Sequence, residues 1–391
     1  MAGKKNSPRI VIIGAGATGR GQLGRLAYEA GFAITFIEAK RDLVDLLRST
    51  KKYLVALAGE VIRLKEIAGF DILQTAELIR CVQAIASADI TATAVLPTNL
   101  QAIAPLLAKG LSLRRQLNVR KPLNVFACEN MERSSKTLRE YVMRHIPRMD
   151  WTWVDRHVGF PDAMVACLVP WPADPLILLS EEVQEWSVDG RAVKQPMPPL
   201  RGMTLSPNLE AALEKKLYIK NTGHMTIGIL GHLRGYGLMH EAARDPEIFG
   251  LAEAATKESA AAVVEKHGFD ARETEEYRRS FLAQMRSPFL PDEIRRIIRE
   301  LKRKLGPEER LVGPALLCIA QGRDPKALAE VIARAFTIAN PDDPQSVEMR
   351  AMLEAQGIER TAESVCGIPN NHRLTQLVSS RFRKSVRAGD R

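Results

Sequence analysis

The chain has 391 residues, of which 46% are hydrophobic and 26% charged, and its formal net charge is +10. This length is too great for one ordinary hydrophobic core and suits two domains. No apolar run approaches the roughly 20 residues that cross a bilayer, and the apolar stretch after the basic start is too short for a secretory signal. We therefore expect a cytoplasmic protein with no membrane partner.

Short β-branched runs alternate with helical patterns in the first half of the chain, which is typical of βαβ units around a parallel sheet. The predicted helices are 19–30, a helix that includes 42–47, and 99–109. The predicted strands are 10–14, 33–38, 90–95, 123–127, 150–154, 165–168 and 183–187.

A proline-rich stretch at 194–202 predicts irregular structure and a domain boundary. Beyond it the pattern is almost entirely helical, with predicted helices at 208–220, 247–267, 271–285, 291–305 and 325–336. The predicted fold is α/β, with an N-terminal Rossmann-type doubly wound sheet over residues 1–200. A mostly α-helical C-terminal domain follows over 201–385, with a basic tail at 386–391.

A glycine motif lies between the first predicted strand and the first predicted helix. Its sequence is Gly14-Ala15-Gly16-Ala17-Thr18-Gly19, which fits G-x-G-x-x-G. The glycines permit a tight turn, close approach of a pyrophosphate and close helix packing, and the helix N-terminus favours the anion. Glu38 ends the next strand and can accept hydrogen bonds from an adenosine ribose. This carboxylate favours NAD over NADP, although Lys40 and Arg41 could pair with a 2′-phosphate.

A second cluster lies in the helical half, at Lys216, Asn221 and His224. At about 100° per residue, Asn221 lies about 140° and His224 about 80° around an α-helix from Lys216. The three side chains can therefore point to one cleft. A lysine of lowered pKa can take a hydroxyl proton, and an asparagine amide can steady an oxyanion. The alternative is an exposed lysine, a helix-capping asparagine and a structural histidine.

The sequence resembles the mannitol-1-phosphate 5-dehydrogenases of the polyol-specific long-chain dehydrogenase family. The matching motifs occur in the same order and cover nearly the whole chain. They are the glycine motif with Arg20-Gly21, Ala30-Gly31-Phe-Ala-Ile-Thr35-Phe36, Thr93-Ala-Val95, Ala127-Cys-Glu129-Asn130-Met131, Val154-Asp155-Arg156, Leu217-Tyr…Asn221-Thr-Gly223-His224, Ser287-Pro-Phe-Leu290 and Arg303-Lys-Leu305.

This resemblance implies that Lys216 is the catalytic lysine, that Asn221 and Asn130 hold the oxyanion, and that His224 contacts substrate. It also implies a polar role near the active site for Asp155, which could instead be a buried acid paired with Arg156. Three positions depart from the family pattern, at Ala17-Thr18, Lys220 and Leu301. The departure at Leu301 falls in the loop that contacts substrate in this family, so the resemblance does not determine the substrate.

A phosphorylated sugar needs cations, and four arginines are candidates for binding it. Arg296, Arg299 and Arg303 recur at helical spacing, and Arg133 follows Asn130 closely. The alternative is a solvated basic helix face.

The sequence therefore predicts an NAD-dependent oxidoreductase that interconverts mannitol 1-phosphate and fructose 6-phosphate. It would use no metal, since the scattered Cys81, Cys128, Cys167, Cys318 and Cys366 form no zinc or disulfide pattern. One alternative is a dehydrogenase of an unphosphorylated polyol or a sugar acid, and another is a non-catalytic NAD sensor. Nucleic-acid binding would suit the basic charge, but no recognisable module accompanies it. We expect a small-molecule partner and a monomer rather than an obligate oligomer.

Overall fold

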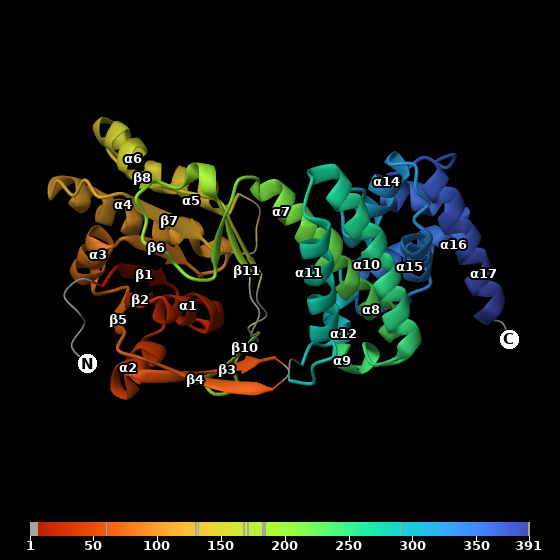
Figure 1. Cartoon of the computed structure of the whole chain (residues 1–391), viewed down its shortest axis with the longest axis horizontal. Coiled ribbons are helices and arrows are strands. Elements are labelled where there is room, and N and C mark those ends of the chain that lie inside the picture. The colour runs from red at the N-terminus through yellow and green to blue at the C-terminus, as the bar shows by residue number, and fades with distance from the viewer. Residues whose placement is uncertain are drawn as a thin grey trace. The chain divides into compact units, whose positions relative to one another are not determined.

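The computed structural model of the protein describes residues 7–59, 61–129, 131, 133–166, 169, 172–181, 185–289 and 291–389. The chain divides into two compact units, Met1–Leu209 and Glu210–Arg391. The first unit is built on strands and the second on helices (Figure 1).

A six-stranded sheet forms the centre of the first unit. Its order is β5-β2-β1-β6-β7-β8, and every neighbouring pair is parallel. Since β2 and β6 flank β1 on opposite sides, the strand order reverses there, which is where an open α/β sheet binds its ligand. The strands are β1 (Arg9–Ile13), β2 (Ala33–Glu38), β5 (Asp71–Gln74), β6 (Ile90–Thr93), β7 (Leu123–Ala127) and β8 (Val158–Gly159).

Helices cover both faces of this sheet. Ile10 and Ile12 of β1 belong to one hydrophobic cluster, whereas Val11 and Ile13 belong to another. This alternation buries each face separately, and it confirms the predicted doubly wound sheet. A π-helix (Gly19–Gly24) continues into α1 (Arg25–Glu29), and the other helices of the unit are α2 (Arg41–Thr50), α3 (Leu78–Ser87), α4 (Leu100–Gln116), α5 (Ser134–Met143) and α6 (Trp151–His157).

Two smaller three-stranded sheets complete the first unit. One has the order β10-β3-β4 and joins Ile177–Glu181 to the hairpin of Lys52–Ala58 and Ile62–Ala68. The other has the order β12-β11-β9 and comprises Met203–Ser206, Glu185–Asp189 and Ala163–Ala166. The hairpin was not predicted from the sequence. The predicted strands at 165–168 and 183–187 correspond to β9 and β11, with 167, 168, 183 and 184 outside the described residues.

The predicted strand at 150–154 is wrong, because this segment is the start of α6. Its aromatic alternation resembles a strand, but the ring of Trp153 stacks on that of His157 four residues later, with centroids 4.9 Å apart. Trp151 Nε1 also donates to the carbonyl of Ile146. The contact between Trp153 and His157 needs helical spacing.

The regular elements among the described residues of the second unit are all helices, and Leu238 and Glu293 form one isolated β-bridge between loops. Its core gathers side chains such as Ile227, Ile229, Val263 and Leu328, which are fully buried. The long helix α10 packs against α8, α11, α14 and α15. The helices are α7 (Leu209–Lys216), a π-helix (Leu217–Asn221), α8 (Thr222–Leu233), α9 (Met239–Ala242), α10 (Pro246–His267), α11 (Ala271–Gln284), α12 (Ile294–Ile297), α13 (Leu301–Lys304), α14 (Val312–Ala320), α15 (Lys326–Ala335), α16 (Pro344–Cys366) and α17 (Arg373–Gly389).

The predicted continuous helix at 291–305 is also wrong. The chain breaks between α12 and α13, where Glu300 takes a left-handed conformation with φ 56°. The break buries the adjacent Ile297 and Ile298, and the Leu301 N–H that it frees donates to the carboxylate of Asp343. Consequently Arg296, Arg299 and Arg303 do not share one helix face.

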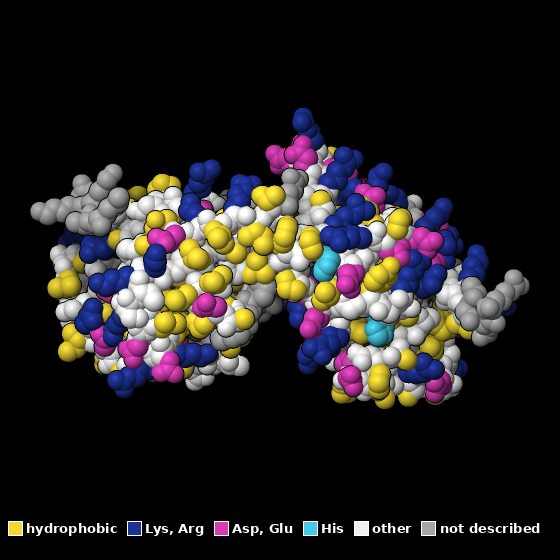
Figure 2. Space-filling model, turned by 90° about the horizontal axis from the view of Figure 1, so that it is seen from below, with side chains coloured by type: hydrophobic (Ala, Val, Ile, Leu, Met, Phe, Trp, Pro, Cys, Tyr) yellow, Lys and Arg dark blue, Asp and Glu magenta, His cyan; other side chains and the backbone are white. Residues whose placement is uncertain are grey.

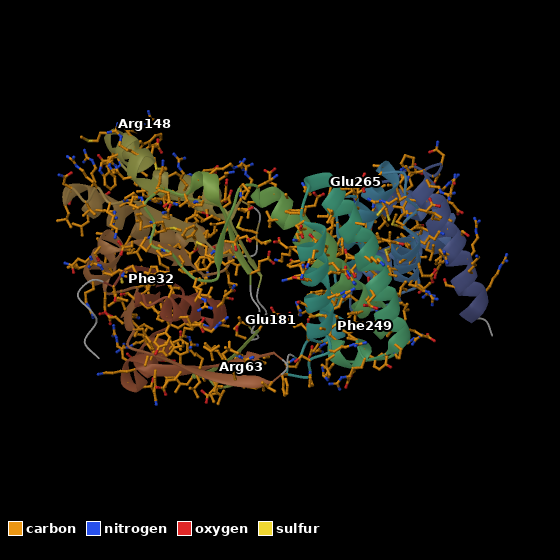
Figure 3. The ribbon with its side chains drawn as sticks, in the orientation of Figure 1. Phe32, Arg63, Arg148, Glu181, Phe249 and Glu265 are labelled. Atoms are coloured by element: carbon orange, nitrogen blue, oxygen red, sulfur yellow. The ribbon has the colours of Figure 1, made fainter. Side chains whose placement is uncertain are left out.

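The surface carries mixed charge. On the face in Figure 2, Lys and Arg side chains of the helical unit are interspersed with Asp and Glu. The labelled Phe32 is buried in the core of the first unit, whereas Phe249 packs against the core of the second (Figure 3). No helix among the described residues has the length and apolar content needed to span a bilayer.

Candidate functional site

The glycine motif forms the turn between β1 and the first π-helix. Gly14 has φ +98°, and a Cβ there would lie 2.4 Å from the carbonyl oxygen of Ala94. A Cβ on Gly19 would lie 1.9 Å from the oxygen of Gly14, whereas one on Gly16 would meet no atom within 4 Å. The first and third glycines are therefore required by packing. The second leaves open space at the backbone, which is where a pyrophosphate needs to approach. The motif thus fits a dinucleotide.

Glu38 is tied into this turn by its carboxylate. Oε2 accepts a hydrogen bond from the N–H of Ala15 at 2.8 Å, and Oε1 accepts from those of Ala39 and Lys40 at 2.8 and 2.9 Å. A carboxylate offers about four acceptor positions, two on each oxygen, so Oε2 retains one position for a ribose hydroxyl. The Arg41 side chain is 81% exposed, and its Nε lies 3.6 Å from Oδ2 of Asp45.

A buried arginine that sequence reasoning did not single out supports the glycine turn. Arg20 is 2% exposed, and its Nε donates to the carbonyl of Ala15 at 2.6 Å while a second nitrogen donates to that of Pro175. Burial lowers the pKa of Arg20, and the charges of Tyr53 and Glu38 partly oppose this. These hydrogen bonds hold the Arg20 side chain against the turn, where its positive charge favours binding of a pyrophosphate. The sequence signal for this role was the position of Arg20 directly after the glycine motif.

The neighbouring strand ends meet through another buried acid. Glu129, at the end of β7, accepts hydrogen bonds from the Thr93 hydroxyl and the Val95 N–H, each at 2.9 Å. Burial raises the pKa of Glu129, although these hydrogen bonds oppose the shift. Glu129 thus joins β6 to β7 directly before Asn130, which lies outside the described residues.

The loop after β6 contains a strained residue. Leu96 has φ 78° and ψ 148°, a region that side chains other than glycine rarely occupy. It is 69% exposed. Strain of this kind gathers at binding sites, and this loop lies at the carboxyl edge of the sheet beside the glycine turn.

In the second unit, a π-helical turn separates Lys216 from Asn221. Lys216 ends α7, and the π segment Leu217–Asn221 leads directly into α8. The expected angle of about 140° assumed α-helical geometry. In a π turn the hydrogen bonds run from residue i to i+5, so residues five apart come closer to one face. His224 follows Asn221 by three residues on α8, a spacing that also shares a face. Turns of this kind are frequent at functional sites.

His224 is held by an acid that sequence reasoning missed. Its Nε2 lies 2.7 Å from Oδ2 of Asp292, and Oδ1 of the same carboxylate accepts two hydrogen bonds from Arg296, at 3.0 and 2.6 Å. Burial alone would raise the pKa of Asp292, but His224 and Arg296 outweigh it and hold that pKa below its usual value. The carboxylate therefore stays ionised and orients the imidazole ring.

Two glycines on α8 allow α12, the helix that follows Asp292, to pack closely against it. A Cβ on Gly228 would lie 2.6 Å from Cγ2 of Ile297, and one on Gly231 would lie 2.6 Å from Cδ1 of Ile294. Helix α12 therefore packs directly on the backbone of α8. The sequence signal was the Pro291-Asp292 pair ahead of a short helix.

Lys304 is a second residue that was not predicted. Its ammonium donates to the carbonyl of Ile297 at 2.8 Å. Burial and the nearby Arg310 and Arg303 lower the pKa of Lys304 to about 8. The backbone carbonyl of Arg310 in turn accepts the hydroxyl hydrogen bond of Thr222, next to Asn221. Arg310 therefore lies near both Lys304, whose pKa it lowers, and Thr222, which begins α8.

The predicted phosphate-binding arginines fall into two groups. Arg303 is bound by Glu300 and Glu309, with nitrogen–oxygen distances of 2.8 Å, and Arg296 is bound by Asp292. Arg299 is exposed, and Arg133 is the N-cap of α5 in a left-handed conformation with φ 52°. Neither Arg299 nor Arg133 forms an ion pair with another residue in the described part of the chain.

Asp155 is not brought together with these residues. It lies on α6 ahead of β8, at the amino edge of the sheet, whereas the glycine turn lies at the carboxyl edge. Its carboxylate is exposed and pairs with Arg139 at 2.7 Å, not with Arg156. The alternative of a buried acid is therefore wrong, and its position gives no support to a substrate contact.

Lys220 also has a defined environment. Its ammonium lies 4.7 Å from the ring centre of Tyr277, and that of Lys215 lies 4.9 Å from the same ring. Both lysines are therefore directed to α11.

The described cysteines Cys81, Cys128, Cys318 and Cys366 are buried free thiols, and Cys167 lies outside the described residues. Burial is the main cause that raises the pKa of each of the four.

Comparison with known proteins gives a consistent result. The profile of the mannitol dehydrogenase Rossmann domain matches residues 8–202, and that of the mannitol dehydrogenase C-terminal domain matches residues 208–382. The structure resembles that of a D-sorbitol dehydrogenase, at 16% identity and a TM-score of 0.82, over 98% of this chain and 94% of that one. It also resembles Pseudomonas fluorescens mannitol 2-dehydrogenase in complex with NAD and D-mannitol, at 17% identity and a TM-score of 0.68, over 98% and 93% of the two chains. At these identities the likeness concerns the fold.

Proposed function

The chain belongs to the mannitol dehydrogenase family and is an NAD-dependent polyol dehydrogenase, and we propose that it interconverts mannitol 1-phosphate and fructose 6-phosphate. The proposed chemistry is supported by the π turn between Lys216 and Asn221 and by the His224–Asp292 pair at 2.7 Å.

The cofactor is held by residues of the glycine turn and by Glu38. The open backbone at Gly16, at the start of the helix, would admit the pyrophosphate, and the Glu38 carboxylate would accept a hydrogen bond from the ribose. When bound, the nicotinamide accepts or supplies the hydride that changes the oxidation state of the substrate carbon.

Lys216 is the general base when the alcohol is oxidised and the general acid when the ketone is reduced. It takes the hydroxyl proton on its ε-amine, or returns it. The side-chain amides of Asn221 and Asn130 donate hydrogen bonds to the oxygen that becomes negatively charged. His224, fixed by Asp292, orients a substrate hydroxyl. The chain's own lysine and amides thus supply the proton transfer and the charge stabilisation.

Exposed Arg299 supports the phosphate ester as substrate. A guanidinium without a carboxylate partner can grip a phosphate through two hydrogen bonds. Arg299 lies between α12 and α13, on the same segment as Asp292 and Lys304. Arg133, near the end of β7, offers a second cation of the same kind.

A specific observation favours a second candidate substrate, an unphosphorylated polyol or a sugar acid. Arg296 and Arg303 already have carboxylate partners, so they are less available to a phosphate. In that case the Asp292–Arg296 pair would serve only to position His224.

The experiment is NADH oxidation at 340 nm with fructose 6-phosphate and with fructose, in wild type and in Arg299→Gln. We expect turnover with the phosphate ester, and a KM for it raised at least tenfold by Arg299→Gln with little change in kcat. Arg295→Gln is the matched control, because Arg295 is exposed and already pairs with Glu293. Turnover with fructose alone, or an unchanged KM in Arg299→Gln, would contradict phosphate recognition and leave the second candidate.

A further inference from the structure

A pocket of about 800 Å³ opens at the amino edge of the large sheet, away from the glycine turn. Arg9 begins β1, Asp89 directly precedes β6, and Lys121 precedes β7. Because all these strands are parallel, this edge is opposite to the one that carries the dinucleotide motif. The whole lining belongs to the first unit. The pocket is therefore separate from the residues assigned to the cofactor.

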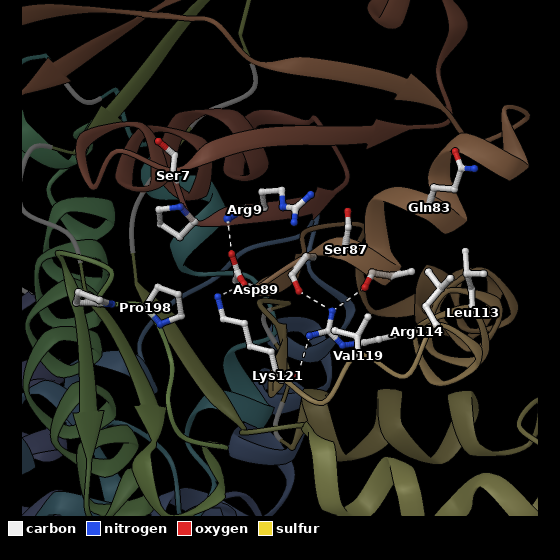
Figure 4. A pocket seen from close by; sticks show the side chains of 15 residues that line it. Ser7, Arg9, Gln83, Ser87, Asp89, Leu113, Arg114, Val119, Lys121 and Pro198 are labelled. Atoms are coloured by element: carbon white, nitrogen blue, oxygen red, sulfur yellow. Dashed lines mark hydrogen bonds and ion pairs between the residues drawn. The ribbon is translucent and has the colours of Figure 1, made fainter. Parts of the chain in front are cut away.

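The charged groups of the pocket are arranged around one carboxylate. Asp89 accepts a hydrogen bond from the backbone N–H of Arg9 at 2.7 Å and pairs with the Lys121 ammonium at 2.5 Å. The guanidinium of Arg9 itself is exposed and forms no ion pair with a described residue (Figure 4). Arg9, Lys121 and Arg114 face a single Asp89, so two positive charges are not balanced within the lining.

Arg114 is the most unusual member of the lining. It is 1% exposed, and its two terminal nitrogens donate to the carbonyls of Ala86, Ala88 and Lys121 at 2.7 to 2.8 Å. Its Nε has no hydrogen-bond partner. A buried N–H donor without a partner costs about 1–3 kcal/mol, so the chain keeps the Arg114 charge beside the pocket at a cost in stability.

The remaining lining is suited to an uncharged ring. Pro8, Pro198, Pro199, Leu113, Leu117 and Val119 supply apolar walls. The Gln83 carboxamide can both donate and accept hydrogen bonds, as a heterocyclic edge requires. In Figure 4, Gln83 and Pro198 lie toward opposite sides of the group formed by Arg9, Ser87 and Asp89. The volume lies in the range of small-molecule sites.

We propose that this pocket is a second ligand site, which binds a phosphate monoester attached to an uncharged heterocyclic ring. A phosphate monoester carries close to two negative charges at neutral pH, which matches the two positive charges that the lining leaves unbalanced. Arg9 and Lys121 would contact the phosphate, and the proline and leucine walls would contact the ring. This site does not depend on which polyol the enzyme oxidises.

The test is calorimetric titration of adenosine 5′-monophosphate into protein saturated with NADH, so that the cofactor site is filled. Adenosine and inorganic phosphate are titrated separately. We expect one saturable site for the monophosphate, with adenosine and phosphate each bound at least tenfold more weakly. Binding should also weaken between about 50 and 300 mM salt, as expected for an ion-pair contact.

Two variants locate the site. Arg9→Gln, alone and with Lys121→Gln, should weaken monophosphate binding at least tenfold without changing NADH turnover. Arg148→Gln is the charge-matched control, since Arg148 is exposed beside α6 and outside the pocket (Figure 3). The proposal is overturned by absence of monophosphate binding, by wild-type affinity in Arg9→Gln, or by adenosine binding as tightly as the monophosphate. Thermal unfolding of each variant checks that it is folded.

Discussion

The pair formed by His224 and Asp292 gives the sharpest prediction about the site. Replacing Asp292 with asparagine keeps the shape of the side chain and one acceptor oxygen but removes the charge. A hydrogen bond to a charged group contributes about 1.5–3 kcal/mol, against about 0.5–1.5 kcal/mol for a neutral one. The expected loss is therefore about 1–1.5 kcal/mol. Since about 1.4 kcal/mol corresponds to a factor of ten, kcat/KM should fall about tenfold in Asp292→Asn.

The assay is the steady-state rate of NADH oxidation, with Asp245→Asn as the matched control. Asp245 has the same side-chain exposure as Asp292, 9%, and it also binds an arginine, but it caps α10. Asp245→Asn should keep wild-type kcat/KM. His224→Ala and the double variant complete a cycle, in which the Asp292→Asn effect should largely disappear once His224 is absent. Equal losses in the two aspartate variants, or additive losses in the cycle, would refute the positioning role.

Three further predictions concern the cofactor, the pH dependence of stability and backbone strain. Glu38→Gln loses at least one of the three backbone hydrogen bonds to its carboxylate, so the KM for NAD should rise at least tenfold and the preference over NADP should fall, measured with both cofactors. The pKa of Lys304 is about 8 in the folded protein against 10.5 for the free group, so the unfolded chain binds more protons between these values and stability rises with pH across that window. The free energy of unfolding in urea should rise between pH 7.5 and pH 10 in wild type and not in Lys304→Met. An equal change of this free energy with pH in the two proteins would contradict the prediction. Leu96→Gly should raise the free energy of unfolding by about 1 kcal/mol, because relief of about 1–3 kcal/mol of strain exceeds the entropic cost of glycine; unchanged or lower stability would show that the loop is not strained.

The central parallel sheet could be predicted because its signals are local. Mostly buried apolar runs at β1, β2 and β7, and the glycine motif after the first of them, identify strand, turn and helix without any distant contact. The predicted class, a Rossmann-type sheet followed by a helical unit, is confirmed. The hairpin of β3 and β4 could not be predicted in the same way. Most of β4 is exposed, so its sequence lacks the alternation that a half-buried strand shows.

The wrong helix at 291–305 has its physical cause in tertiary contacts. The break at Glu300 follows from burying Ile297 and Ile298 together and from the contact with Asp343, which lies 42 residues away from Leu301. Helical spacing alone could not reveal either contact. The same holds for Asp292, whose partner His224 lies 68 residues away. Local motifs identified the residues proposed for chemistry, whereas the residues that position them became visible only in three dimensions.

The most direct test of the proposed chemistry is turnover of NADH by Lys216→Ala, with Lys215→Ala as the neighbouring control. A general acid–base group contributes about 10²–10⁴-fold, so turnover with fructose 6-phosphate should fall by that factor in Lys216→Ala while the Kd for NADH stays within about twofold. Lys215, which lies over the rings of Phe269 and Tyr277, should be replaceable with little loss of turnover. Near wild-type turnover in Lys216→Ala, or an equal loss in both variants, would contradict the assignment of Lys216 as the proton-transfer residue.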